Sequence, residues 1–228
     1  MLSDQEWMAT RLSLIVATCA TVLALGPAVL LGYGLSRPTF RGRWLVETLV
    51  NLPLVLPPVV TGYLLLMLFS PRGAVGSFLE RALGLQIAFT WLGAVLAAAI
   101  MSLPLMVRAM RVAFAGVDPQ LEAAARTMGA GRVDAFCSVS LPLAWHGVIG
   151  GLALGFARSL GEFGATILIA GNIIGETQTI PLAIYSQAQR PGGFERVWPL
   201  VAVSIVLAVI TLAAAEWLER RGGRRELT

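Results

Sequence analysis

The sequence predicts an all-α protein, a polytopic membrane helical bundle of about five spans with a helix–turn–helix elbow on its cytoplasmic side. Two observations carry this prediction. The 228 residues are 57% hydrophobic and only 13% charged, whereas a soluble domain has roughly 25% charged residues. The apolar residues also gather in nearly uncharged stretches long enough to cross a bilayer, which takes about 20 helical residues. We expect the whole chain, residues 1–228, to form one transmembrane domain.

The spans are expected at approximately 12–36, 46–70, 85–108, 145–172 and 197–218. The first of these is too long for the apolar region of a signal peptide, and acidic residues precede it, so we interpret it as a span. The fourth contains Arg158 and Glu162, but its apolar character continues beyond them.

Arginine residues predict the orientation, because basic residues gather in the short cytoplasmic loops of membrane proteins. All 17 basic residues are arginine: eleven fall in the first loop, the third loop and the C-terminal tail, and five fall on the opposite side. We therefore expect the N-terminus outside and the C-terminus in the cytoplasm. The eleven are Arg37, Arg41, Arg43, Arg108, Arg111, Arg126, Arg132, Arg220, Arg221, Arg224 and Arg225.

The lack of lysine bears on the energy source. A P-loop needs a lysine that reaches the β- and γ-phosphates of ATP, and no GxxxxGK[ST] pattern occurs. An ATP-driven process would need a partner ATPase, which would hold the ATP and Mg²⁺. We expect no cofactor, metal or catalytic residue in this chain, whose single histidine, His146, has no nucleophile or metal-ligand pattern around it.

Residues 116–144 predict the elbow between the third and fourth spans. Asp118 is a good N-cap residue, and Pro119 suits the first helical position. Strong helix formers follow, and Gly129 predicts the end of this helix. A second short helix follows, which we expect Pro142 to break before the fourth span.

The second span contains three prolines within six residues, in the stretch NLPLVLPPVVTGYLLL. Proline removes a backbone donor and kinks a helix, so we expect a bent or broken span. The bend either serves helix packing or lines a pathway, in which case Thr61 and Gly62 lie beside it. The candidate residues here are Pro53, Pro57, Pro58 and Thr61.

The fourth span carries FARSLGEFGAT over residues 156–166. Arg158 and Glu162 stand at i and i+4 on one helix face, about 20 Å from Trp145 at the start of the span. A lone arginine there costs about 2.5–3.5 kcal/mol, so the pair should face the bundle or a wet cavity. The pair either fixes helix packing or gives an anion pathway positive potential. The candidate residues are Arg158, Ser159, Gly161, Glu162, Gly164 and Thr166.

The elbow resembles the EAA loop of bacterial ABC importer permeases. That pattern has an EAA triplet, a glycine four residues after its last alanine, then an apolar residue and Leu-Pro. Gly129, Val139, Leu141 and Pro142 match it.

One departure from this pattern concerns the glutamate, whose position falls on Ala123, so that Glu122 stands one residue early. The resemblance implies that the elbow docks into a cleft on the ATPase subunit and carries the motion of that subunit to the membrane. The residues expected to serve this coupling are Glu122, Ala124, Ala125, Gly129, Val139, Leu141 and Pro142.

Three stretches, LPLVLPPVVTGYLLL, ARSLGEFGAT and GETQTIP, are together similar to the molybdate permease family. Related sulfate permeases share the glycine–glutamate–aromatic–glycine element of residues 161–164. The resemblance implies a homodimer in the bacterial inner membrane with two ABC ATPase subunits, an extracytoplasmic molybdate-binding protein, surrounding lipid and no nucleic acid. It also implies molybdate import by alternating access.

The sequence is also compatible with other functions. A permease of the same architecture for sulfate or tungstate is the nearest alternative, because all three substrates are tetrahedral dianions. A membrane-embedded enzyme and a structural subunit that transports nothing are more distant alternatives.

Overall fold

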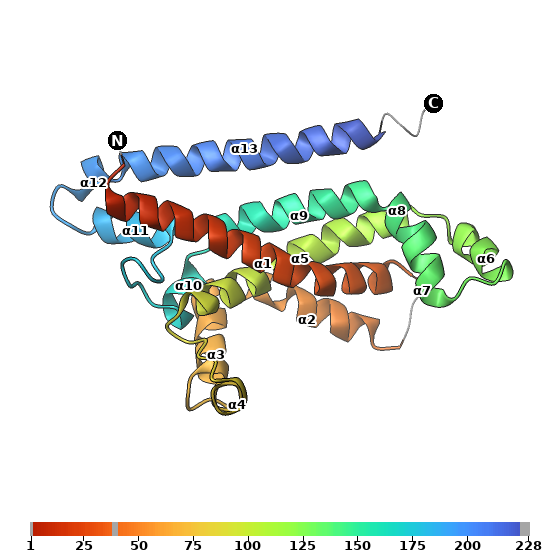
Figure 1. The fold of residues 1–228 in the computed structure, drawn as a ribbon, viewed down its shortest axis with the longest axis horizontal. Coiled ribbons are helices and arrows are strands. Elements are labelled where there is room, and N and C mark those ends of the chain that lie inside the picture. Colours follow the sequence, from red (N-terminus) through yellow and green to blue (C-terminus); the bar gives the residue numbers. More distant parts are fainter. Residues whose placement is uncertain (1, 38–40, 224–228) are drawn as a thin grey trace.

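The structure is a computed structural model that describes residues 2–37 and 41–223, in which all regular secondary structure is helical. Figure 1 shows an elongated bundle in which the longest helices run along one axis. These are α1 (Asp4–Ser36), α5 (Trp91–Ala115), α9 (Trp145–Leu160) and α13 (Trp198–Gly223). The shorter helices are α2 (Arg43–Val55), α3 (Pro58–Phe69), α4 (Ala74–Leu83), α6 (Pro119–Thr127), α7 (Arg132–Ala135), η1 (Phe136–Ser140), α8 (Leu141–Leu143), α10 (Gly164–Ile169), α11 (Ile180–Ala188) and α12 (Gly193–Arg196).

The core lies where α5 packs between α1 and α9, and glycines bring these helices close together. A Cβ atom on Gly32 of α1 would lie 2.8 Å from the Cβ of Met110, and one on Gly155 of α9 would lie 2.5 Å from the sulfur of Met106. Both methionines are fully buried. Small residues at such contacts are typical of helices that pack inside membranes.

Local signals shift the ends of two predicted spans. The helix α1 begins eight residues before the predicted span because Ser3 and Glu6 form a capping box, which satisfies free backbone donors of the first turn. The helix α5 begins only at Trp91. Before it, Gly84 and Phe89 adopt positive φ angles of 64° and 60°, which interrupt helical geometry over residues 85–90.

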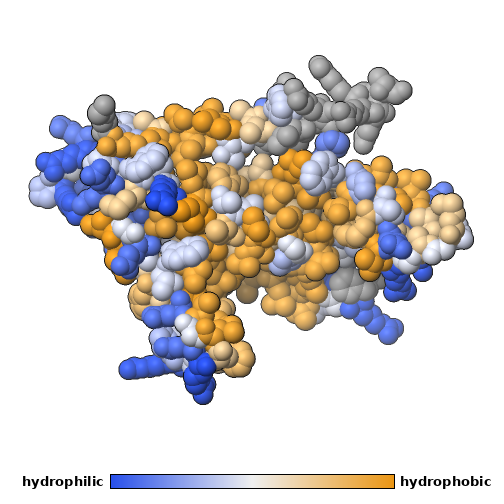
Figure 2. Space-filling model, viewed as in Figure 1, coloured by the Kyte–Doolittle hydropathy of each residue, from blue (hydrophilic) through white to orange (hydrophobic). Residues whose placement is uncertain are grey.

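Within the described residues, α1 and α5 are long and apolar enough to cross a membrane alone. Up to four segments qualify if each of two bent pairs counts as one span, namely α2 with α3 and Arg132–Leu143 with α9. The apolar part of α13, Trp198–Ala214, is shorter. Figure 2 shows apolar surface along the bundle, with hydrophilic residues gathered toward its ends and around α4.

The bend expected from the proline run is confirmed. The helix α2 ends at Val55, α3 begins at Pro58, and the two meet at 111°. Pro58 stands at the first position of α3, where the missing N–H has no helical partner to lose. Pro53 lies inside α2, two residues before that helix ends.

The fourth predicted span contains a helix break that its sequence did not indicate. The helix α9 ends at Leu160, and α10 begins at Gly164. Gly161 caps α9, and the carboxylate of Glu162 accepts a hydrogen bond from the backbone N–H of Ala165 at 2.9 Å. This side chain satisfies a donor that a continuous helix would have paired with a carbonyl.

The helix start predicted in the elbow is confirmed. Asp118 is the N-cap of α6, its side chain accepts the N–H of Gln120 at 2.9 Å, and Pro119 is the first helical residue. Gly129 follows α6 with a φ of 100°, which favours glycine.

The break expected near Pro142, before the fourth span, is confirmed, although its position differs slightly. Pro142 stands in the first turn of α8, that helix ends at Leu143, and the 74° bend follows at Ala144, just before α9.

The C-terminal arginines used to predict the orientation fall largely outside what the structure describes. Arg224 and Arg225 are outside the described residues, as are the side chains of Arg220 and Arg221.

Candidate functional site

Glu122 of α6 turns toward the bundle and joins three elements of the chain. Its carboxylate forms an ion pair with Arg37, at the end of α1, and accepts hydrogen bonds from the hydroxyl of Ser140 in η1 and, at 3.0 Å, from that of Tyr33 in α1. Only 18% of the Arg37 side chain and 17% of the Glu122 side chain are exposed. Glu122 therefore holds the elbow against the end of α1.

Aromatic rings surround this ion pair. The ring of Tyr33 packs edge-on against Phe114 of α5, at 5.5 Å between centroids, and against Phe136 of η1, at 4.7 Å. The guanidinium of Arg37 lies 5.0 Å from the centroid of the Tyr33 ring, a cation–π distance. The elbow is thus fixed to both α1 and α5 by aromatic contacts as well as by charge.

The environment of Glu122 changes its acidity. Burial alone would raise the pKa of Glu122, but hydrogen bonds from Ser140, Tyr33 and Arg37, together with the positive charge of Arg37, outweigh burial. The pKa of Glu122 therefore lies below its ordinary value, and the carboxylate stays ionised.

Several apolar side chains of the elbow are exposed to the surroundings. Met128 is 83% exposed, Val133 is 75% exposed, and Leu121 is also exposed. Of the other predicted coupling residues, Ala125 is buried, Val139 and Leu141 are half-buried, and Ala124, Gly129 and Pro142 are exposed.

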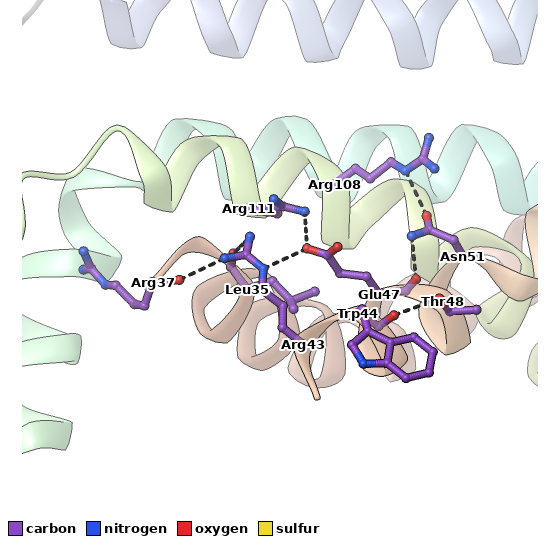
Figure 3. Close-up of polar contacts among 9 residues, drawn as sticks. All are labelled: Leu35, Arg37, Arg43, Trp44, Glu47, Thr48, Asn51, Arg108 and Arg111. Carbon is purple, nitrogen blue, oxygen red and sulfur yellow. Dashed lines mark hydrogen bonds and ion pairs between the residues drawn. The ribbon is translucent and has the colours of Figure 1, made fainter. Parts of the chain in front are cut away.

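A second polar cluster lies between α2, α5 and the end of α1. Figure 3 shows the carboxylate of Glu47 between two arginines. Its Oε1 atom lies 2.9 Å from Nε of Arg43, one turn earlier in α2, and 2.9 Å from Nη1 of Arg111 in α5. Arg43 also donates to the carbonyls of Leu35, at 2.8 Å, and Arg37, at 3.3 Å.

Asn51 extends this cluster by one turn along α2. Its Oδ1 accepts a hydrogen bond from Nε of Arg108 in α5 at 3.0 Å, and its Nδ2 donates to the carbonyl of Glu47 at 2.6 Å (Figure 3). The residues outside α2 that take part in this cluster therefore belong to the end of α1 or to α5.

The two broken helices meet at the places where they are broken. A Cβ atom on Gly164, the first residue of α10, would lie 2.7 Å from the Cβ of Pro58, the first residue of α3. One turn further, a Cβ on Gly62 would lie 2.6 Å from the carbonyl oxygen of Ala165. Gly62 therefore packs against α10. The expectation that Thr61 and Gly62 lie beside a pathway stays a prediction.

The predicted pairing of Arg158 with Glu162 is confirmed, with 2.7 Å between Nη2 and Oε2. The Glu162 side chain is only 2% exposed, whereas that of Arg158 is 26% exposed. Thr61 follows the first break closely in the sequence, and Ser159 shortly precedes the second. Both residues are buried, and neither hydroxyl has a hydrogen-bond partner within the described residues. Thr166 is also buried, and Gly161 is exposed.

The GETQTIP stretch packs against the N-terminal half of α1. The hydroxyl of buried Thr177 accepts the N–H of Ile173 at 2.9 Å, which closes a turn. The N–H of Ile180, at the start of α11, donates to the hydroxyl of Ser13 in α1 at 2.7 Å. This segment is therefore an ordered part of the bundle.

Sequence reasoning missed most of the residues that fasten the elbow and α2. The partners of Glu122 lie far from it in the chain, so no local pattern indicates them. The spacing of Arg43 and Glu47 at i and i+4 was the one visible signal. The residues missed are Tyr33, Arg37, Ser140, Arg43, Glu47, Asn51, Arg108 and Arg111.

No group of three or more His, Cys, Asp or Glu residues in the described part of the chain is placed to hold a metal ion. The clusters around Glu122 and Glu47 each combine one carboxylate with arginines, which are ligands for anions or carboxylates rather than for cations.

Comparison with known proteins places this architecture. Residues 28–223 match the family of binding-protein-dependent transport system inner membrane components. The molybdenum transport system permease protein ModB of Escherichia coli (strain K12) is 51% identical over 98% of this chain and 100% of its own length. The sulfate transport system permease protein CysT of the same strain is 36% identical over 98% of this chain and 80% of its own length.

A solved structure has the same fold. It is the crystal structure of a bacterial alginate ABC transporter in complex with an alginate pentasaccharide-bound periplasmic protein, with a TM-score of 0.73 and 19% identity. The similarity covers 96% of this chain and 80% of that one. From the family match and the near full-length relatives, we conclude that this chain belongs to the family of binding-protein-dependent transport system inner membrane components.

Proposed function

We propose that this chain is the membrane permease subunit of an ATP-driven importer that moves molybdate, a tetrahedral dianion, into the cytoplasm. The observation that carries the proposal is the 51% identity to a molybdenum permease over essentially the full length of both chains. The weaker similarity to a sulfate permease makes sulfate the second candidate substrate.

The energy comes from a partner in this proposal. The chain has no lysine and no P-loop, so two ABC ATPase subunits bind and hydrolyse ATP with Mg²⁺. Each docks on the exposed apolar side of an elbow, which includes Leu121, Met128 and Val133. The buried side of the same elbow carries Glu122, so the surface that receives the partner and the contact that holds α1 belong to one small unit.

We propose five spans in the inner membrane, with the N-terminus outside. The helices α1 and α5 supply the first and third spans, and the bent pair α2–α3 supplies the second. The helix α9, continued by α10 after the break at residues 161–163, supplies the fourth, and α13 supplies the fifth. The elbow and the Glu47 cluster then lie on the cytoplasmic side. Two copies form the pathway, and an extracytoplasmic binding protein delivers the anion.

The broken helices mark the pathway in this proposal. Interrupted helices are tolerated inside a membrane where they line a cavity or are covered by protein. The ion pair of Arg158 with Glu162 is neutral as a whole, so it provides no deep trap for a dianion. The pathway is therefore a conduit, in which access alternates between the two faces and the binding protein provides the selectivity.

The test is ATP hydrolysis by the complex reconstituted in vesicles with its ATPase subunit and binding protein. We expect molybdate- and tungstate-loaded binding protein to stimulate hydrolysis and sulfate-loaded protein to have little effect. Stimulation by sulfate alone would overturn the substrate while leaving the importer. If no ATPase subunit assembles with the chain, the importer function itself is wrong.

A further inference from the structure

The helix α2 is held in an unusual way for a membrane protein. None of its residues is buried, and apolar side chains such as Leu45, Leu49 and Val55 are exposed. Besides Val46 and Val50, which pack against the core, its contacts with the bundle include a polar stripe formed by Arg43, Glu47 and Asn51. These three residues are spaced four apart and therefore share one face of the helix.

This stripe joins α2 to the end of α1. Arg43 donates to the carbonyls of Leu35, in the last turn of α1, and Arg37, its C-cap residue. Carbonyls at this end of a helix have no partner within the helix. A positive charge at this end also suits the helix dipole. Arg43 thus fixes the start of α2 to the end of α1 directly (Figure 3).

The same residue at the end of α1 also holds the elbow. The carbonyl of Arg37 receives Arg43 of α2, while its guanidinium forms the ion pair with Glu122 of α6. A continuous series of contacts therefore runs from α6 through Arg37 and Arg43 to Glu47, and from Glu47 to Arg111 of α5. It connects the elbow to α2.

These contacts differ physically from the packing of the core. The Glu47 side chain is 32% exposed and that of Arg111 is 41% exposed, so water replaces either partner at low cost. At the glycine contacts between α5 and α9, water has no room to replace either partner, because the interior there is close-packed. The Glu47 cluster can therefore shift by a small amount together with α2 and the end of α1 while the core stays rigid.

We propose that Arg43 and Glu47 are positioning residues that make α2 follow the elbow, and that α2 carries this movement across Pro57 to α3. The proposal rests on the importer function above and deepens it. The end point of the movement is the contact of Gly62 in α3 with Ala165 in α10, where the two broken helices meet.

The test measures how much molybdate enters per ATP hydrolysed, using the full complex in vesicles with loaded binding protein. The variants are Glu47→Gln, Arg111→Gln and the double variant, and Glu80→Gln on the exposed side of α4 is the matched control. We expect each single change to lower the ratio about two- to fivefold, as for a partly exposed ion pair. The double variant should be no worse than the worse single variant, because both changes remove one contact.

Two results would overturn this inference alone: an unchanged ratio in Glu47→Gln, or effects of the single changes that multiply in the double variant. If the unaltered complex transports no molybdate, tungstate or sulfate, the proposed function falls and the inference with it. Transport by the unaltered complex therefore distinguishes a failure of the proposed function from a failure of this inference alone.

A second measurement does not depend on transport. Spin labels on Thr48→Cys in α2 and Gln120→Cys in α6, both exposed positions, report the distance between α2 and the elbow once Cys19 and Cys137 are replaced by alanine. We expect a narrow distance distribution in the parent and a broad one with Glu47→Gln. Equal widths would mean that Glu47 does not position α2.

Discussion

Arg158 and Glu162 form an ion pair in which the arginine is partly exposed and the carboxylate is buried, with 2.7 Å between Nη2 and Oε2. Glu162 also accepts the N–H of Ala165, so one carboxylate both neutralises the arginine and caps α10. The pair therefore stands at the break between α9 and α10, where charge and backbone geometry depend on each other.

Removing the arginine alone should destabilise the protein, because it leaves the buried Glu162 carboxylate without a counter-charge. We expect Arg158→Gln to cost about 3 kcal/mol, measured by thermal unfolding of the purified chain in detergent. The double variant Arg158→Gln with Glu162→Gln should recover most of that loss. A double variant as unstable as the single one would contradict the buried-charge explanation.

Transport separates the two roles that the sequence leaves open for Arg158. If its positive potential serves the anion, Arg158→Gln should abolish uptake in a complex that still assembles. Near-normal uptake by an assembled complex would assign Arg158 to packing. The double variant provides the comparison, because its neutral pair preserves the fold more fully.

The contact between α3 and α10 leaves no room for a methyl group. We expect Gly62→Ala to lower the stability by about 1–3 kcal/mol, the usual cost of overpacking, because its Cβ would lie 2.6 Å from a backbone carbonyl oxygen. Gly26→Ala in α1 is the matched control, since nothing lies within 4 Å of its added Cβ. The control should be neutral or slightly stabilising. Similar losses in both variants would show that the close approach does not matter.

Docking of the ATPase should depend on the exposed apolar residues of the elbow. We expect Met128→Ser to weaken binding of the ATPase subunit about tenfold, because a buried methionine contributes about 1.5–3 kcal/mol at an interface. The affinity of the detergent-solubilised chain for the ATPase subunit measures this. Leu83→Ser, at the exposed end of α4, is the control and should bind as the parent does. Normal affinity of Met128→Ser would place the docking surface elsewhere.

The lowered pKa of Glu122 predicts a dependence on pH. A carboxylate with a depressed pKa in the folded state stabilises the protein fully above its ordinary pKa of about 4.3 and loses this effect as pH falls through the folded value. We expect Glu122→Gln to lower the melting temperature most near pH 6 and progressively less as the pH falls below that ordinary pKa. An equal effect at every pH would mean that the charge of Glu122 does not hold the elbow.

The features that sequence predicts here are those with a local cause. The bend before Pro58 follows from the proline run, and the start of α6 follows from Asp118 and Pro119. The pairing of Arg158 with Glu162 was expected from their spacing of four residues, and it forms although Glu162 lies just beyond the end of α9. Each of these depends on residues within about one or two turns.

The features that sequence misses depend on contacts between distant segments. The break at residues 161–163 contains no proline, and its geometry depends on the approach of Gly164 to Pro58, more than a hundred residues earlier. Glu122 likewise finds Arg37 only because the elbow folds back onto α1. Local patterns carry no information about such partners, so the buried side of the elbow could not be predicted.

The shared position of the two helix breaks has a further electrostatic consequence. At each break, regular helical hydrogen bonding is interrupted, and other bonds replace part of it, such as that from the N–H of Ala165 to the carboxylate of Glu162. Because α3 and α10 start side by side, these interrupted peptide groups gather at one place. The self-energy of an ion in a medium of low dielectric constant grows with the square of its charge. In the proposed pathway, polar backbone groups at this place would therefore matter more for a doubly charged ion than for a singly charged one.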